Sequence, residues 1–68
     1  MDALALKGKI RAEGKTQSDA AKMCGISLST FNAKINGTNG AEFALGEIVR
    51  LRHGLHMELD EAARIFLS

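Results

Sequence analysis

The sequence contains no proline, no tryptophan and no tyrosine, and only one cysteine and two histidines. One cysteine cannot close a disulfide within the chain, and with two histidines it makes a poor structural zinc set. No apolar run approaches the roughly 20 residues that a membrane-spanning helix needs. Met1-Asp2-Ala3-Leu4 lacks the basic segment and the long apolar stretch of a secretory signal. These absences predict a soluble cytoplasmic protein that does not associate with membranes.

The chain is long enough for one small domain spanning residues 1–68. With 46% hydrophobic residues and 25% charged residues of both signs, its composition excludes a disordered chain. A domain of this size without a disulfide or a metal has a stability margin of only about a few kcal/mol. We therefore expect its stability to come from packed apolar side chains or from self-association.

The net charge of +1 combines two unlike halves. Residues 1–40 hold six Lys or Arg against three acids, and residues 41–68 hold three against five. A positive half within a small domain predicts an anionic partner for that half.

The segments between glycines are rich in Ala, Leu, Lys, Glu and Arg, which are strong helix formers. No stretch alternates β-branched and polar residues as a half-buried strand does. The sequence therefore predicts an all-α fold of five short helices without strands.

Three of these helices are predicted in residues 1–40. Each ends at a glycine that can adopt a left-handed conformation: Gly14, Gly25 and Gly37. The second and third begin at residues that cap helix N-termini, Thr16 (with Asp19 as a capping-box-like partner) and Ser27. Apart from Gln17, their inner faces are small or apolar side chains. At helical spacing the inner residues are, in order, Ala3, Leu6, Ile10, then Gln17, Ala20, Ala21, Cys24, then Phe31 and Ile35.

Two further helices are predicted in residues 41–68. The first ends at His53-Gly54, and its inner positions are Leu45, Ile48, Val49 and Arg52. Its start lacks a good cap, because Ala44 stands where a Ser or Thr is expected. The second begins at Asp60, or as early as His56. Its inner positions are Ala62, Ile65 and Phe66, and Leu55 and Leu59 are expected to pack in the connection.

Two glycines fall inside predicted helices, Gly8 and Gly46. A glycine there costs about 1 kcal/mol relative to Ala. These glycines either permit close helix crossings or are tolerated weaknesses.

Residues 16–37 contain a capped short helix, a glycine turn, a second capped helix and a glycine stop. Ala21 is small where two helices must cross closely, and Gly25 can take the positive φ of a tight turn. The underside of the second helix can be buried by three apolar residues: Ile26, Phe31 and Ile35. This order of features is typical of a helix-turn-helix. The alternative is an ordinary helical hairpin within a small bundle.

Four segments of this motif carry a family resemblance: Thr16-Gln17 through Ala21, Gly25-Ile26-Ser27, Ser29-Thr30-Phe31 and Lys34-Ile35-Asn36-Gly37. They resemble the helix-turn-helix of the lambda-type phage repressor and Cro family. Phe43 through Ile48 and Ile65-Phe66-Leu67 look like the fourth and fifth helices of short prophage Cro-like regulators. The resemblance implies five helices, dimeric DNA binding at a two-fold symmetric operator, and control of transcription. Ala44 departs from the pattern of this family, in which a capping Ser or Thr is expected at the start of the fourth helix.

If the helix of about residues 28–36 enters the major groove, residues near its N-terminus reach base edges. The expected base-reading residues lie at its cap and on its outward face: Ser27, Leu28, Ser29, Asn32 and Ala33. Asn32 can pair with adenine, and Leu28 and Ala33 can meet thymine methyl groups. No arginine lies on this face to bind guanine, so readout should favour A·T pairs. The alternatives are that Leu28 packs against Phe31 and that Asn32 is merely solvated.

The expected phosphate-binding residues flank the start of the motif and the exit of its second helix: Gln17, Lys15, Lys34, Asn36, Thr38 and Asn39. Gln17 can donate from its side chain and from the amides of the helix end. Lys22 is a further candidate, although a surface lysine is by default a solvated charge. The expected partner is a double-stranded DNA operator.

Phe66-Leu67 is the expected contact of a homodimer, formed at least on DNA. The alternative is that Ile65 and Phe66 only complete the core of the monomer. A second function also stays open, in which the same fold binds another regulator as an antirepressor, through its acidic or apolar C-terminal surface.

We expect no catalytic activity, cofactor, metal or small-molecule ligand. The sequence has no nucleophile with a matched base, no phosphate loop and no carboxylate pair. His53, His56 and Glu58 supply too few convergent ligands for a metal. Cys24 is expected to be a small buried hydrophobe, with a redox switch as the alternative.

Overall fold

The secondary structure is entirely helical, which confirms the predicted fold class. The computed structural model describes residues 1–68 and contains five α-helices, one short 3-10 turn and no strand. The elements are α1 (Ala3–Ala12), α2 (Gln17–Cys24), α3 (Leu28–Asn36), η1 (Thr38–Gly40), α4 (Leu45–Gly54) and α5 (Leu59–Phe66). No helix combines the length and the hydropathy that crossing a membrane would require.

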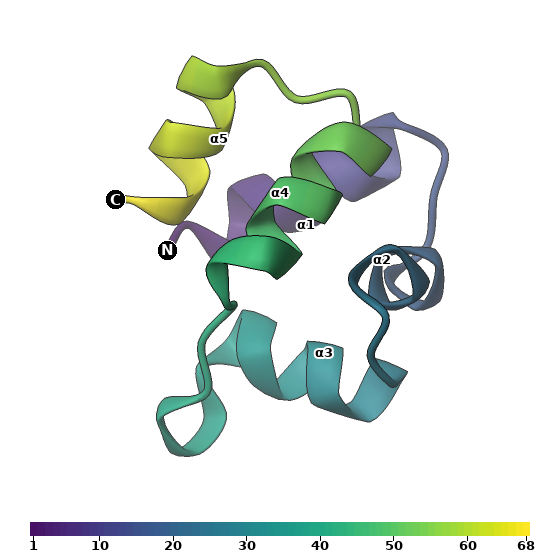
Figure 1. Cartoon of the computed structure of the whole chain (residues 1–68), viewed down its shortest axis with the longest axis vertical. Coiled ribbons are helices and arrows are strands. Elements are labelled where there is room, and N and C mark those ends of the chain that lie inside the picture. The colour runs from purple at the N-terminus through teal and green to yellow at the C-terminus, as the bar shows by residue number, and fades with distance from the viewer.

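The two ends of the chain lie together, and α3 lies at an edge of the molecule (Figure 1). The Met1 ammonium donates to a main-chain oxygen of Ser68 at 3.1 Å, and the Asp2 amide donates to the Ile65 carbonyl at 2.7 Å. These bonds join the start of α1 to the end of α5. The path from α3 to α4 runs through η1.

Side chains cap α2 and α3 at the predicted positions. The Asp19 amide donates to Thr16 Oγ1 at 3.1 Å, and the Thr16 amide donates to Asp19 Oδ2 at 2.8 Å. The Thr30 amide donates to Ser27 Oγ at 3.1 Å. The glycines expected to end helices all have positive φ angles: Gly14 at 71°, Gly25 at 73° and Gly37 at 67°. Local signals therefore predicted these helix ends correctly.

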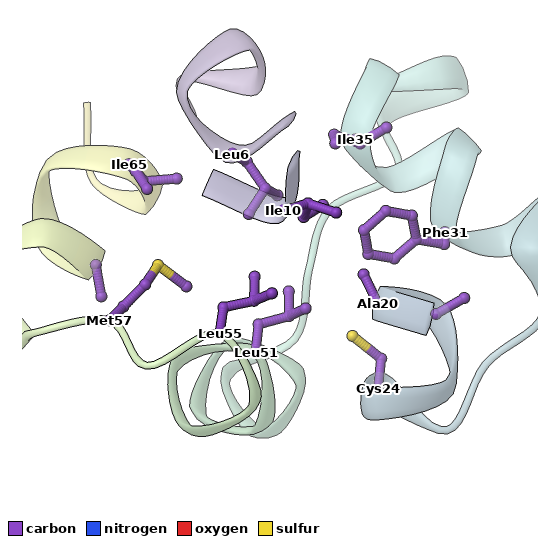
Figure 2. Packing of buried hydrophobic residues seen from close by; sticks show 12 residues of the cluster. Leu6, Ile10, Ala20, Cys24, Phe31, Ile35, Leu51, Leu55, Met57 and Ile65 are labelled. Carbon is purple, nitrogen blue, oxygen red and sulfur yellow. The ribbon is translucent and has the colours of Figure 1, made fainter. Parts of the chain in front are cut away.

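The core is one cluster of 12 buried hydrophobic residues (Figure 2). Its largest fully buried side chains come from α1, α3, α4 and the residue that follows α4: Leu6, Phe31, Leu51 and Leu55. Phe31 packs edge-on against Phe43 with ring centroids 5.3 Å apart, and Phe43 packs against Phe66 at 5.9 Å. This aromatic row links α3 to α5.

The inner face of α4 differs from the prediction. Leu45 and Val49 were expected to face inward, but their exposed fractions are 77% and 45%. Glu47 and Leu51 are buried instead, with exposed fractions of 8% and 0%. The other two predicted inner residues, Ile48 and Arg52, are partly buried.

The position of Glu47 accounts for this rotation of α4. Its carboxylate accepts a hydrogen bond from Lys34 Nζ at 2.6 Å and another from the Ala44 amide at 2.8 Å. With these bonds, a charged residue takes an inward position on α4 that hydrophobic spacing assigned to its neighbours. The bond from the Ala44 amide is the reciprocal half of a capping box, although Ala44 has no side-chain oxygen to cap the first turn.

The connection between α4 and α5 packs Met57 rather than Leu59. Met57 is 4% exposed and Leu59 is 70% exposed, whereas Leu55 is buried as expected. The chain turns at His56, whose φ of 55° is left-handed, and the Met57 amide donates to the Arg52 carbonyl at 2.9 Å. This turn directs Met57 into the core. α5 begins one residue before Asp60, and its predicted inner side chains are buried or partly buried: Ala62, Ile65 and Phe66.

The two glycines inside helices do not permit close crossings within the molecule. A Cβ at Gly8 would have no neighbour within 4 Å, and one at Gly46 would meet only the Arg50 guanidinium at 4.0 Å. The close approach occurs at Gly54 instead, where a Cβ would lie 2.5 Å from Met23 Sδ. Gly8 and Gly46 are therefore tolerated weaknesses in this fold.

Gly8→Ala should raise the free energy of unfolding by about 0.5–1 kcal/mol, because alanine favours the helix and meets no neighbour there. Gly54→Ala is the matched contrast and should stabilise the chain less than Gly8→Ala does, because the Met23 side chain has to move away. Urea unfolding followed by circular dichroism measures both variants. A destabilised Gly8→Ala, or a Gly54→Ala that stabilises the chain as much as Gly8→Ala does, would contradict the packing described for these two positions.

Candidate nucleic-acid interface

α2 and α3 are joined by the short turn Gly25-Ile26-Ser27. The chain leaves α2 through Gly25 in the left-handed conformation, and the Ile26 amide donates to the Ala21 carbonyl at 3.1 Å. Ala20 and Ala21 are buried where α2 packs on its neighbours, and their small side chains allow close approach. Figure 1 shows α2 nearly end-on while α3 lies across the view, so the two helices cross steeply.

α3 is anchored along one face only. Phe31 and Ile35 are 0% and 2% exposed, and Figure 2 shows both among the core side chains. The five residues expected to read bases lie outside this buried pair: Ser27, Leu28 and Ser29 are exposed, and Asn32 and Ala33 are half-buried. Leu28 is 43% exposed and does not belong to the core cluster. The fold thus leaves this face of α3 accessible to a ligand.

The Ser27 hydroxyl already has partners within the chain. It accepts the Thr30 amide at 3.1 Å and donates to Thr30 Oγ1 at 3.0 Å. Because a serine has one hydroxyl proton, only acceptor capacity is left for a ligand. Ser27 therefore serves first to cap α3. Hydrogen bonds donated to a ligand are left to the side chains of Ser29 and Asn32.

The residues expected to bind phosphate fall at two places on the α2–α3 pair. Lys15 and Gln17 lie at the start of α2, where Lys15 is exposed and Gln17 is partly buried. The other group lies at the end of α3 and in η1, and its members are exposed: Asn36, Thr38 and Asn39. Lys15 takes part in no ion pair, and neither does Lys22 on α2.

Lys34 was expected to bind phosphate, but it is held inside the chain. Its ammonium donates to Glu47 Oε1 at 2.6 Å and to Glu47 Oε2 at 2.9 Å. The two side chains are 19% and 11% exposed. Hydrogen bonding from Lys34 holds the pKa of Glu47 below its ordinary value. α3 therefore presents no unpaired cation, because Lys34 is its only basic residue.

Sequence reasoning missed Glu47 as a partner of α3. A Glu three residues after the poorly capped Ala44 is a signal for the bond to the Ala44 amide. The pairing with Lys34 joins residues 13 positions apart in different helices, and no local pattern indicates it.

α4 also contacts the end of α2. Arg50 Nη1 donates to the Cys24 carbonyl at 3.4 Å, and Cys24 Sγ lies 4.0 Å from the Glu47 carbonyl oxygen. Cys24 is 3% exposed, and burial raises the pKa of its thiol to about 11. Cys24 is therefore buried and protonated at neutral pH, as expected of a small hydrophobe rather than a reactive thiol.

The C-terminal residues expected to meet a second copy lie in different surroundings. Ile65 is buried, and Phe66 is partly buried against Phe43. Leu67 is 82% exposed. Ile65 and Phe66 thus complete the core of the monomer, and Leu67 is the exposed apolar residue at this end of the chain.

The chain matches no family model, no curated protein and no solved structure. Its function is therefore inferred from the arrangement of its own residues. The features that bear on function are the α2–α3 pair, the exposed face of α3 and the charges around that face.

The stability of the domain should fall in acid. Hydrogen bonds lower the pKa of three carboxyl groups in the folded state, namely those of Glu13 (from His56), Asp19 (from Thr16) and Glu47 (from Lys34). The unfolded chain therefore binds more protons than the folded chain as the pH falls through the carboxyl range, so the stabilisation is lost from about pH 5 downward.

Glu47→Gln should reduce the slope of the free energy of unfolding against pH in this range, because one of these groups is removed. Glu42→Gln is the control, since Glu42 is exposed and makes no ion pair. Urea unfolding at a series of pH values gives both slopes. Equal slopes for the two variants would contradict a stabilising role for the Glu47 carboxylate.

Proposed function

We propose that this protein is a sequence-specific DNA-binding regulator of transcription, in which α2 and α3 act as a helix-turn-helix. The observation that carries the proposal is α3 itself. This short helix is anchored by Phe31 and Ile35, is joined to α2 through a left-handed glycine, and leaves Leu28, Ser29 and Asn32 accessible. A helix held in this way suits insertion into the major groove, with α2 across the phosphate backbone.

The base contacts in this proposal come from residues 28–33 of α3. Asn32 forms a pair of hydrogen bonds to adenine, Leu28 and Ala33 contact thymine methyl groups, and Ser29 bonds to a base or a phosphate. No arginine is available on α3 for guanine. The preferred operator is therefore rich in A·T pairs.

The phosphate contacts come from the two exposed groups on the α2–α3 pair. Lys15, Gln17 and the amides at the start of α2 bind one phosphate region, in keeping with the positive end of a helix dipole. Three polar residues bind a second region beyond the end of α3: Asn36, Thr38 and Asn39. Lys34 has no part in this set, because Glu47 accepts its hydrogen bonds.

The modest number of contacts per copy favours binding as a homodimer. Two copies on a two-fold symmetric operator would place their α3 helices about 34 Å apart, one turn of DNA. Exposed Leu67 is a candidate contact between the copies. Sedimentation with and without a palindromic duplex measures whether the homodimer forms without DNA, forms only on DNA or does not form.

A different function, binding to another regulator as an antirepressor, is favoured by two observations. Leu45 and Val49 are exposed one turn apart on α4, and α3 has no free cation. Exposed apolar side chains on an otherwise well-packed helix can serve a protein partner. In that case DNA binding would be weak and independent of sequence.

Selection of duplexes from a random-sequence library, followed by mobility-shift titration, distinguishes these functions. The regulator proposed here enriches an A·T-rich, two-fold symmetric sequence and binds it more tightly than a random duplex of equal length. Enrichment of no sequence would reject sequence-specific binding and leave the protein-binding function in its place.

Asn32→Ala should weaken binding to the selected duplex by about 1–3 kcal/mol and relax the preference at one base pair. Binding to a random duplex should change little, because Asn32 contributes a base contact. Repeating the selection with the variant identifies the relaxed position. Equal losses on the selected and the random duplex would remove Asn32 from the base-reading set.

Lys15→Met should weaken binding to both duplexes alike, because the lysine contacts phosphate. The slope of log affinity against log salt should become less steep by about 0.9, the value for one phosphate contact. Lys7→Met is the matched control, since Lys7 lies on α1, outside the α2–α3 pair. Titrations at several salt concentrations measure the slope, and an unchanged slope for Lys15→Met would contradict its role.

A further inference from the structure

The Glu47 carboxylate joins α3 to the start of α4. It accepts two hydrogen bonds from Lys34 in the C-terminal half of α3, at 2.6 and 2.9 Å. It accepts a third from the Ala44 amide at 2.8 Å, which caps the start of α4. The connection from α3 to α4 through η1 is thereby closed by bonds at both of its ends. The residue itself is 8% exposed.

The same turn of α4 also contacts α2. The Glu47 carbonyl oxygen lies 4.0 Å from Cys24 Sγ, and Arg50 donates to the Cys24 carbonyl. One turn of α4 thus contacts the last residue of α2 through the backbone of Glu47 and contacts α3 through its side chain. The crossing of α2 and α3 is held at both helices by this one turn.

Lys34 has its charge cancelled by this arrangement. The Lys34 side chain is 19% exposed and its ammonium donates to both carboxylate oxygens, so it is neither free to extend nor a net positive charge on α3. A free lysine at that place would attract any DNA duplex, because phosphate attraction does not depend on sequence. The ion pair therefore removes a contribution that would favour the wrong sites.

We propose that Glu47 is a positioning residue with two effects on DNA binding: it fixes the orientation of α3 against α2 and α4, and it withholds Lys34 from phosphate. The proposal rests on the DNA-binding function proposed above. It assigns sequence preference in part to a residue that does not touch DNA. Loss of Glu47 should lower preference while raising general affinity.

Glu47→Gln is the informative variant. A glutamine keeps a side-chain oxygen that can accept the Ala44 amide, and it has nearly the same size, but it has no charge to pair with Lys34. The cap of α4 is thus retained while the ion pair is lost. Glu42→Gln makes the same change of net charge at an exposed glutamate without an ion pair, and it serves as the control.

The variants are titrated with two probes, the duplex selected by the wild type and a random duplex of equal length, at several salt concentrations. Glu47→Gln should bind the random duplex more tightly, with a log–log salt slope steeper by about 0.9, because Lys34 is released. Its preference for the selected duplex should fall about tenfold, the order expected for one lost base contact. Glu42→Gln should change neither slope nor preference in this way.

Two further variants separate the effect of Glu47 on the orientation of α3 from its effect on the charge of Lys34. In Lys34→Met/Glu47→Gln the salt slope should return to the wild-type value, because the released cation is gone. The preference for the selected duplex should stay low, because α3 still lacks its ion pair to α4. Lys34→Gln alone should leave the slope unchanged, because this charge is not available to DNA in the wild type. A slope less steep by about 0.9 for Lys34→Gln would show a direct phosphate contact and overturn the proposal. Parallel losses on both duplexes for Glu47→Gln would reduce Glu47 to a structural role and overturn it as well.

Nuclear magnetic resonance distinguishes failure of this inference from failure of the proposed function. Glu47→Gln should shift the amide resonances of α3 from Leu28 to Asn36, and Glu42→Gln should not. If no duplex is bound, the DNA-binding function and the role of Glu47 in it both fail, and these resonances decide whether Glu47 still orients α3. If a duplex is bound and the α3 resonances do not move, the positioning role alone is overturned.

Discussion

The structure depends on the burial of Phe31. Five of the nine residues of α3 are polar, and the helix contributes only two deeply buried side chains, Phe31 and Ile35. Phe31 is fully enclosed and begins the aromatic row that continues through Phe43 to Phe66. Burial of an aromatic ring is among the largest favourable terms that one side chain contributes to a small domain. This anchor allows the rest of α3 to stay polar and accessible.

Around this apolar anchor, hydrogen bonds from α4 set the arrangement of the α2–α3 pair. Packing alone tolerates small rotations of a short helix, whereas the bonds of Glu47 are short and have fixed partners, and Arg50 adds a longer bond to the end of α2. A half-buried ion pair adds little net stability when its desolvation cost is counted. Its clearer consequence is geometric and electrostatic, because it joins α3 to α4 and leaves α3 without a free cation.

The elements that sequence reasoning predicted correctly are those with local causes. Thr16 and Ser27 cap helices because their hydroxyls reach amides three residues on, and Gly25 and Gly37 end helices because they tolerate positive φ. The inner residues of the first three helices also followed from spacing. In residues 41–68 spacing failed at Leu45, because the side that faces the core was decided by a charged residue with a partner in another helix.

The sequence by itself determined the fold class, the ends of α2 and α3 and the two anchors of α3, since these depend on backbone conformation and on periodic apolar side chains. It also indicated which residues of α3 would lie outside the core, and Leu28 and Ser29 are exposed as expected. Only the tertiary structure decided that Lys34 is paired with Glu47, that Met57 rather than Leu59 is buried, and that Phe66 belongs to the monomer core. Each of these depends on which residues meet across helices, and that information lies in the packing of the whole chain rather than in any local stretch of it.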